Sequence, residues 1–200
     1  MKKISDTTKL LLSVIILFLI IIYSYQKTSA ERNFKANEVA FNTINGTKTL
    51  KNFSGKIVLL YFGFLSCPDA CPTTLSNYSK AIKELKPEEL NKLQFIFVDV
   101  DPKRDSLQKL HEYTNFFHPS IVSFSASEDV LRPFARYFGA DFKYVELKSG
   151  LGYTVDHTTD IMVINPDTNQ IITNIHHGTN HKLLLPILKE LILNASKEIK

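Results

Sequence analysis

Two cysteines separated by three residues, Cys67 and Cys71, are the residues most able to do chemistry in this sequence. They follow an apolar run and precede Pro72, at a point where a helix is expected to begin. The amide groups of a first helical turn favour a thiolate over a thiol, and thiolates bind soft metals and attack disulfides. Residues four apart share a helix face, whereas Pro72 disfavours helical dihedrals at Cys71 and favours an irregular turn. Either geometry lets both sulfurs hold one ion.

Two sulfurs do not complete a metal site, so we expect a further ligand from elsewhere in the chain. Of six histidines, His157 stands out because it lies in a predicted loop just before the apolar run at Ile161. A loop that enters a neighbouring strand at the same end of a sheet can reach the start of the helix. Two cysteines and one histidine form a soft set of three ligands that suits Cu(I) and can accept another ligand for Cu(II).

The elements that must position these residues follow from the apolar pattern. Residues 57–65 and 93–99 are continuous apolar runs, typical of central strands buried on both faces. An Asn-Gly pair at 45–46 predicts a hairpin over residues 41–50. Further strands are expected at 121–124, 161–164 and 170–175, and helices from Pro72 to Leu85, at 106–117 with Ser106 as cap, at 130–138, and through Leu184, Leu188 and Leu191. This order predicts an α/β domain with a mixed sheet over residues 31–200.

The first 30 residues differ from the rest. Leu10 to Tyr23 is almost wholly apolar, and three lysines precede it. Its length lies between that of a signal-peptide core and a membrane span, so residues 1–30 are expected to be a membrane anchor or a signal segment. The positive flank predicts a cytoplasmic start with the domain exported. We therefore expect a bacterial inner-membrane protein with its domain on the periplasmic or outer side.

Composition and charge exclude several classes of protein. Four of the 24 basic residues and one of the 20 acidic residues lie in the first 30 positions, which leaves 20 basic and 19 acidic residues in the remainder. Such a balanced domain is a poor nucleic-acid binder. The 44% apolar content argues against a disordered chain. Two cysteines are too few for a disulfide-stapled scaffold or an iron–sulfur centre.

Three motifs together resemble those of a known family. FGFLSCPDACP at 62–72, FVDVDPKRD at 97–105 and VDHT at 155–158 match, in order and spacing, the Sco/SenC copper-binding proteins. The resemblance covers residues 40 to 195. It implies a membrane-anchored thioredoxin-like domain with an N-terminal β-hairpin, in which Cys67, Cys71 and His157 bind copper. Members of that family assist assembly of the copper A centre in subunit II of cytochrome c oxidase, by delivering copper, by reducing that centre's cysteines, or both.

The sequence departs from the family pattern at two places. Leu65-Ser66 replaces a Thr-His or similar pair, and Asp160 replaces an apolar residue, which makes Asp160 a candidate partner of the metal ligands. The HHxxxH group formed by His176, His177 and His181 is expected to be exposed or helix-capping rather than a second metal site. In DPKRD we expect a turn and helix start in which Arg104 pairs with a carboxylate.

Other uses of the cysteine pair remain open at this point. A structural disulfide is the default in an exported protein. A thiol–disulfide oxidoreductase or thiol peroxidase would use one cysteine to attack and the other to resolve, with thiol reductants as partners, and a redox sensor would use the same pair. Ordinary thioredoxin-like reductases have CxxC and a cis-proline on the loop that faces it. Here three residues separate the cysteines, and no proline lies between residues 134 and 165, the range that contains His157. Both features favour a metallochaperone over an enzyme, with the oxidase subunit or another copper enzyme as recipient.

Overall fold

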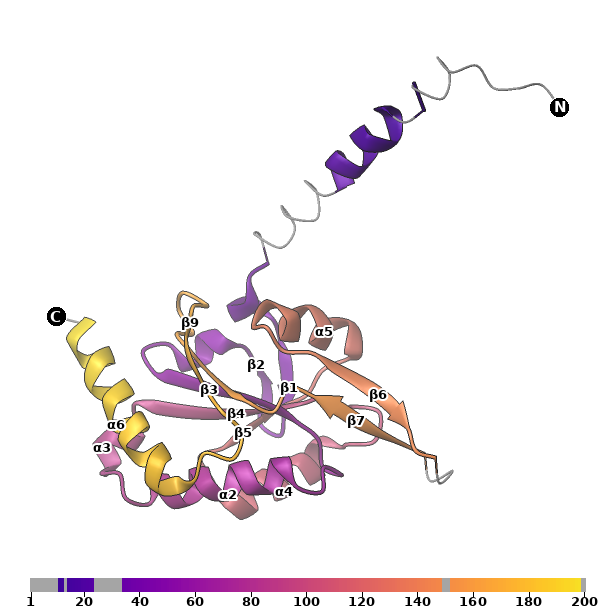
Figure 1. The fold of residues 1–200 in the computed structure, drawn as a ribbon. Helices are drawn as coiled ribbons and strands as arrows, with labels where there is room; N and C mark the ends of the chain where they lie inside the picture. The colour runs from indigo at the N-terminus through magenta and orange to yellow at the C-terminus, as the bar shows by residue number, and fades with distance from the viewer. Residues whose placement is uncertain (1–10, 13, 24–33, 149–151, 199–200) are drawn as a thin grey trace. The chain divides into compact units, whose positions relative to one another are not determined.

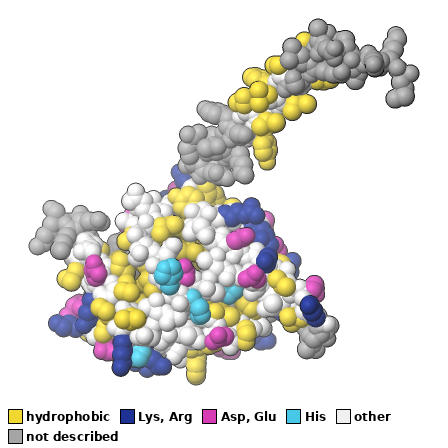
Figure 2. All heavy atoms as spheres, viewed as in Figure 1, with side chains coloured by type: hydrophobic (Ala, Val, Ile, Leu, Met, Phe, Trp, Pro, Cys, Tyr) yellow, Lys and Arg dark blue, Asp and Glu magenta, His cyan; other side chains and the backbone are white. Residues whose placement is uncertain are grey.

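The computed structural model describes residues 11–12, 14–23, 34–148 and 152–198. The chain divides into two compact units, residues 1–35 and 36–200. In the first unit, residues 11–12 and 14–23 are helical, and their apolar side chains lie on the surface (Figure 2). Within the described residues, no helix has both the length and the apolar character needed to cross a membrane. The rest of the predicted anchor or signal segment lies outside the described residues.

A mixed five-stranded sheet forms the centre of the second unit, in the order β5-β4-β3-β8-β9. Strand β3 (Ile57–Gly63) pairs in parallel with β4 (Leu93–Asp99), and β4 pairs in parallel with β5 (Val122–Phe124). Strand β8 (Ile161–Ile164) runs antiparallel to β3, and β9 (Ile171–Ile175) runs antiparallel to β8. Every residue of β3 and β4 is buried, as their continuous apolar sequences predict. The α/β class and the mixed sheet are confirmed.

Helices cover both faces of the sheet. Figure 1 shows α2, α4 and α6 on one side and α5 with the N-terminal hairpin on the other. Side chains of β3 that point to the first side pack with buried residues of α2, α4 and α6 in one core. The helices are η1 (Ala36–Glu38), η2 (Leu50–Phe53), α2 (Ala70–Ile82), α3 (Pro87–Leu90), α4 (Leu107–Phe117), α5 (Glu128–Tyr137) and α6 (His181–Glu198).

The predicted N-terminal hairpin is present as β1 (Phe41–Thr43) and β2 (Gly46–Lys48). Gly46 has φ +95°, which explains why glycine occupies this turn position. Phe41 anchors the hairpin because its ring stacks on Phe124 at 4.7 Å and meets Phe134 edge-on at 4.7 Å. The hairpin therefore completes the core on the α5 side of the sheet.

A second two-stranded sheet, β6 (Phe142–Glu146) with β7 (Tyr153–His157), was not expected from the sequence. The expectation that His157 lies in a loop is wrong, because His157 is the last residue of β7 and pairs with Phe142. Both strands are only partly buried and have no pairing with the five-stranded sheet. Their sequences lack the continuous apolar run that marks β3 and β4.

Two further boundaries bear on the site. Strand β3 ends at Gly63, two residues before the predicted end. Helix α2 begins at Ala70 and includes Cys71 and Pro72, whereas Cys67 lies in the turn before it, so the two cysteines do not share one regular helix. Pro72 is tolerated because it lies in the first turn, where backbone N–H groups have no partner within the helix. Ser106 caps α4 as expected, since its side chain accepts a hydrogen bond from the Lys109 amide.

Replacing Phe41 with alanine tests whether the hairpin is part of the cooperative core. Phe41 is fully buried between two rings, so Phe41→Ala is expected to lower the free energy of unfolding by about 3–5 kcal/mol. Denaturant unfolding of the full chain measures the change. The control is Ile44→Ala in the exposed turn, with an expected change within about 0.5 kcal/mol. Equal losses for the two variants would show that the hairpin is not part of the core.

Candidate metal centre

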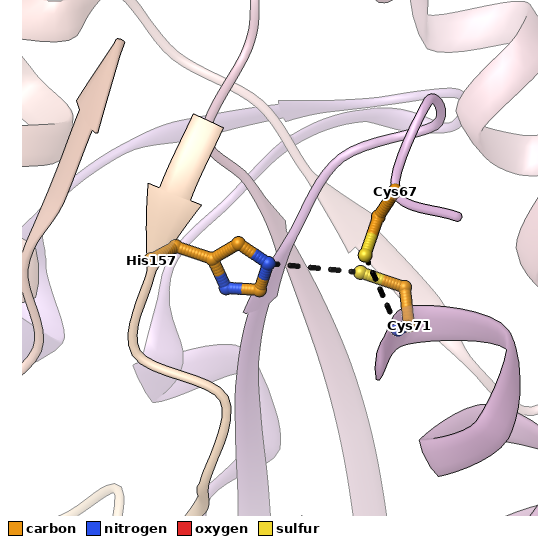
Figure 3. A group of neighbouring side chains, drawn as sticks. All are labelled: Cys67, Cys71 and His157. Atoms are coloured by element: carbon orange, nitrogen blue, oxygen red, sulfur yellow. Dashed lines mark hydrogen bonds between the residues drawn. The ribbon is translucent and has the colours of Figure 1, made fainter. Parts of the chain in front are cut away.

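The two cysteines lie on either side of the start of α2. Cys67 lies in the loop that follows β3, and Cys71 lies in the first turn of the helix. The Cys71 amide donates a hydrogen bond to the Cys67 Sγ at 3.4 Å, so the loop folds back over the helix terminus (Figure 3). Neither cysteine is in a disulfide, and Cys71 is fully buried whereas Cys67 is partly exposed.

His157 completes the group from the other side. Its Nε2 atom lies 4.0 Å from the Cys71 Sγ, and Figure 3 shows the imidazole pointing from the end of β7 toward the two sulfurs. The three potential ligand atoms all lie within 4.8 Å of one another. These three residues are the ligands predicted from the sequence, and the structure brings them together.

The ring of His157 is oriented for coordination. Its Nδ1 atom lies 2.9 Å from the carbonyl oxygen of Thr158. Because a carbonyl oxygen only accepts hydrogen bonds, Nδ1 carries the proton and Nε2 keeps its lone pair. Phe64 and Tyr61 meet the imidazole edge-on, with ring centroids 5.7 and 6.4 Å away. These contacts fix the ring so that its free nitrogen faces the sulfurs.

The two sulfurs differ in charge. A hydrogen bond from the Cys71 thiol is the largest of the effects that lower the pKa of Cys67 to about 4, and the hydrogen bond from the Cys71 amide contributes. The same hydrogen bond, together with burial, raises the pKa of Cys71 well above its usual range. At neutral pH the pair is therefore one thiolate, Cys67, and one thiol, Cys71. The thiolate is the form that binds soft metals and attacks disulfides.

Tyr61 is a further member of the site that the sequence analysis did not identify. Its hydroxyl donates to the Cys71 Sγ at 3.8 Å. Burial is the main cause that raises the pKa of Tyr61, so the hydroxyl stays a neutral donor. A tyrosine within an otherwise apolar buried strand was the available signal, because a buried hydroxyl usually needs a partner.

Gly63 was also missed, although it makes room for the Cys71 sulfur. A β-carbon added at Gly63 would lie 2.8 Å from the Cys71 Sγ and 2.7 Å from the Phe97 ring. Both distances are shorter than real carbon contacts, so only glycine fits at the end of β3. A glycine inside a strand often marks such a close approach, which was the signal in the sequence.

The other polar groups singled out in the sequence are not members of this group of three potential ligands. Asp160 accepts hydrogen bonds from the His177 amide at 3.0 Å and contacts the His176 ring at 3.2 Å. His181 is the first residue of α6. Among the described residues, Cys67, Cys71 and His157 form the only group of three or more cysteine, histidine and acidic residues arranged to hold an ion. Arg104 pairs with a carboxylate, that of Asp101.

The donor set fits a soft metal ion. Two sulfurs and one imidazole nitrogen match the ligands that copper and zinc prefer, and three donors leave a position open for a further ligand. The partial exposure of Cys67 and His157 gives an ion a way in. The arrangement can therefore hold a soft metal ion or carry out thiol exchange.

The fold and the site together define a thioredoxin-like protein with a candidate centre for a soft metal. The chain belongs to the SCO1/SenC family, whose sequence model matches residues 27–193. The expectation of this family and of the thioredoxin-like fold is confirmed.

Relatives of the chain support this assignment. It is 34% identical over 133 residues to the mitochondrial protein SCO1 homolog 1 of Arabidopsis thaliana, a match that covers 66% of this chain and 39% of that protein. The solution structure of apo Sco1 from Thermus thermophilus is 32% identical with a TM-score of 0.68, covering 76% of this chain and 88% of that one. Arabidopsis thaliana ScoI with copper bound is 28% identical with a TM-score of 0.69, covering 79% and 98%.

Replacing Gly63 with alanine is expected to displace the Cys71 sulfur. The added methyl group overlaps this sulfur and the Phe97 ring, so Gly63→Ala should cost about 1–3 kcal/mol of unfolding free energy. Thiol modification kinetics should show faster labelling of Cys71, which is buried in the native protein. The control Gly46→Ala meets no atom within 4 Å and should cost about 1–2 kcal/mol through its positive φ alone, with Cys71 still protected. Unchanged stability and unchanged protection of Cys71 in Gly63→Ala would contradict the close approach of the Cys71 sulfur to Gly63.

Removing the Cys71 thiol is expected to raise the pKa of Cys67. The pKa of Cys67 is about 4 mainly because Cys71 donates to its sulfur, so Cys71→Ala should raise it by about one unit or more, equivalent to about 1.4 kcal/mol. Thiolate absorbance measured against pH gives the value. Cys71→Ser keeps a hydroxyl donor and should show a smaller rise. An equally low pKa in Cys71→Ala would refute the role of this hydrogen bond.

Proposed function

We propose that this protein is a copper chaperone that binds Cu(I) or Cu(II) through Cys67, Cys71 and His157. The observation that carries the proposal is the convergence of two sulfurs and the free Nε2 atom of an imidazole within 4.8 Å. The related ScoI of Arabidopsis thaliana, 28% identical to this chain, has a crystal structure with copper bound. A soft set of three donors matches Cu(I), and the open position accepts a further ligand for Cu(II).

The geometry favours loading and release of the ion. Binding of copper by both sulfurs requires the Cys71 thiol to lose its proton, so loading releases a proton. Cys67 is already a thiolate and is partly exposed, which makes it the first sulfur to meet an incoming ion. Ligand exchange then transfers the ion, since each bond to a recipient thiolate or imidazole replaces one bond to this protein.

The recipient in this proposal is cytochrome c oxidase, whose subunit II holds the copper A centre. Membership of the SCO1/SenC family supports this recipient, and another copper enzyme with thiolate and imidazole ligands would be served by the same chemistry. The matched region spans 39% of the length of the Arabidopsis mitochondrial relative, less than half of that protein.

The proposed location is the outer side of a bacterial inner membrane, with residues 1–30 as anchor or signal segment. The apolar run from Leu10 to Tyr23 and the three lysines before it support this location. The exposed apolar side chains of residues 14–23 are suited to contact with lipid.

A second candidate function is thiol–disulfide exchange, which the lowered pKa of Cys67 favours. The Cys67 thiolate would attack a disulfide of a partner protein, which forms a mixed disulfide and releases one partner thiolate. Cys71 would then give up its proton and attack the Cys67 sulfur. This step releases the second partner thiol, reduces the partner by two electrons and leaves a disulfide between Cys67 and Cys71.

Copper titration of the full chain and its variants tests the proposed function. We expect one Cu(I) per reduced chain, loss of binding in Cys67→Ser, and a fall in Cu(II) affinity of about tenfold or more, equivalent to about 1.4 kcal/mol, in His157→Ala. Competition with a chelator of known affinity provides the measurement. The control is His177→Ala, whose exposed ring lies outside the site. Unchanged copper affinity in His157→Ala would overturn the ligand set, and rapid turnover of disulfides with weak copper binding would favour thiol exchange.

A further inference from the structure

Three buried carboxylates lie at the end of β4, in the segment from Asp99 to Asp105. Asp99 and Asp101 are fully buried and Asp105 is 9% exposed. Buried carboxylates are costly, so each needs partners. Asp99 accepts from the Asp101 amide at 2.9 Å and from the Ser125 hydroxyl at 2.9 Å, and burial raises its pKa to about 7. The guanidinium of Arg104 pairs with Asp101. The proposed ligand set does not use any of these carboxylates.

One side of this group holds the loop of residues 64–69 between β3 and α2, which carries Cys67 and is called the cysteine loop below. The Asp105 carboxylate accepts a hydrogen bond from the backbone amide of Leu65 at 2.8 Å. Leu65 lies two residues before Cys67. The Val100 amide donates to the Gly63 carbonyl at 2.9 Å, at the point where β3 makes room for the Cys71 sulfur. The end of β4 therefore fixes the course of the backbone that leads into the cysteine pair.

The other side holds the β6–β7 hairpin. The Tyr153 hydroxyl donates to Asp101 Oδ1 at 2.8 Å, and the Arg104 Nη1 donates to the Tyr153 carbonyl at 2.8 Å. The guanidinium also lies 3.9 Å from the centroid of the Tyr153 ring. Tyr144 on β6 adds a hydrogen bond from its hydroxyl to the Val100 carbonyl at 3.3 Å.

These contacts matter because the hairpin has no strand pairing with the five-stranded sheet. Besides the three-residue link from β7 to β8, side-chain contacts therefore set its position, and with it the position of His157 at the end of β7. Tyr153 and His157 lie on the same face of β7, since side chains alternate along a strand. Arg132 of α5 also donates a hydrogen bond to the Phe142 carbonyl at 3.0 Å. This hydrogen bond connects the hairpin to α5 and not to the cysteine loop.

We infer that Asp101, Arg104 and Asp105 are positioning residues that join the cysteine loop to the β6–β7 hairpin and thereby set the approach of His157 to the two sulfurs. Asp105 holds the loop, while Asp101 and Arg104 hold Tyr153. The inference rests on the proposed metal centre, and it assigns to the DPKRD segment a role beyond the turn and helix start expected from the sequence.

A double-mutant cycle in Cu(II) affinity tests this inference on the full chain. Tyr153→Phe removes only the hydroxyl that bonds Asp101 and keeps the ring beneath Arg104, so it spares the buried ion pair. We expect Tyr153→Phe to lower Cu(II) affinity by about tenfold, the lower end for partners that orient metal ligands. The same change in the His157→Ala background should have no effect, because the ligand that it positions is absent.

Two further variants separate positioning from general stability. Lys143→Ala is the matched control, because it removes an ion pair of 3.0 Å with Asp156 that lies wholly within the hairpin. This control should leave Cu(II) affinity unchanged. Asp105→Asn keeps an oxygen acceptor for the Leu65 amide and should retain affinity, whereas Asp105→Ala should lose it. The visible charge-transfer spectrum of bound Cu(II) in Tyr153→Phe should shift toward that of His157→Ala.

A measurement without copper keeps this inference distinct from the proposed function. Hydrogen exchange of the metal-free full chain should be faster in the β6–β7 ladder of Tyr153→Phe and unchanged in β3 and β4. Failure of the wild-type chain to bind copper would overturn the proposed function. Hydrogen exchange would still report on the connection between the cysteine loop and the β6–β7 hairpin. An equal loss of affinity with and without His157, no loss in either background, or unchanged exchange in the hairpin would overturn the inference.

Discussion

The buried sulfur of Cys71 lies where β3, α2 and β7 meet, and its packing constrains everything around it. Gly63 leaves the space that the sulfur fills, and Tyr61 places a hydroxyl 3.8 Å from it. A buried polar group without partners is costly, so these neighbours stabilise the fold and shape the site at once. His157 then needs to reach only one fixed atom, 4.0 Å from its Nε2. The candidate metal centre is in this sense a product of core packing.

The hydrogen bond from the Cys71 thiol to the Cys67 sulfur gives the two cysteines different protonation states. Cys67 is the thiolate and is partly exposed, whereas Cys71 keeps its proton in the interior. The same asymmetry suits an ion that enters at Cys67 and displaces the proton of Cys71, and it suits attack on a disulfide by Cys67. A single contact thus underlies both candidate functions, and His157 is the residue that favours metal binding, since disulfide exchange by a cysteine pair does not need a third ligand.

The end of β4 shows how buried charge can serve geometry. Carboxylates placed in the interior gain little net stability from a single guanidinium. Here they accept hydrogen bonds from two segments that share no strand pairing, the cysteine loop through Leu65 and the hairpin through Tyr153. A hairpin held by side chains can be adjusted without breaking the central sheet. That freedom is compatible with a ligand that must both bind an ion and release it.

The sequence by itself determined the central strands, the N-terminal hairpin, the mixed α/β class and the two cysteines, because continuous apolar runs, an Asn-Gly turn and cysteine spacing are local signals. His157 followed from its place before the apolar run at Ile161 and from the family motif VDHT. It did not predict the β6–β7 sheet, because its strands are half exposed and lack such a run. The roles of Tyr61 and Gly63 also depend on partners distant in the chain. Only the tertiary structure decided which sulfur is charged and where His157 lies, since burial and contacts between distant segments set both.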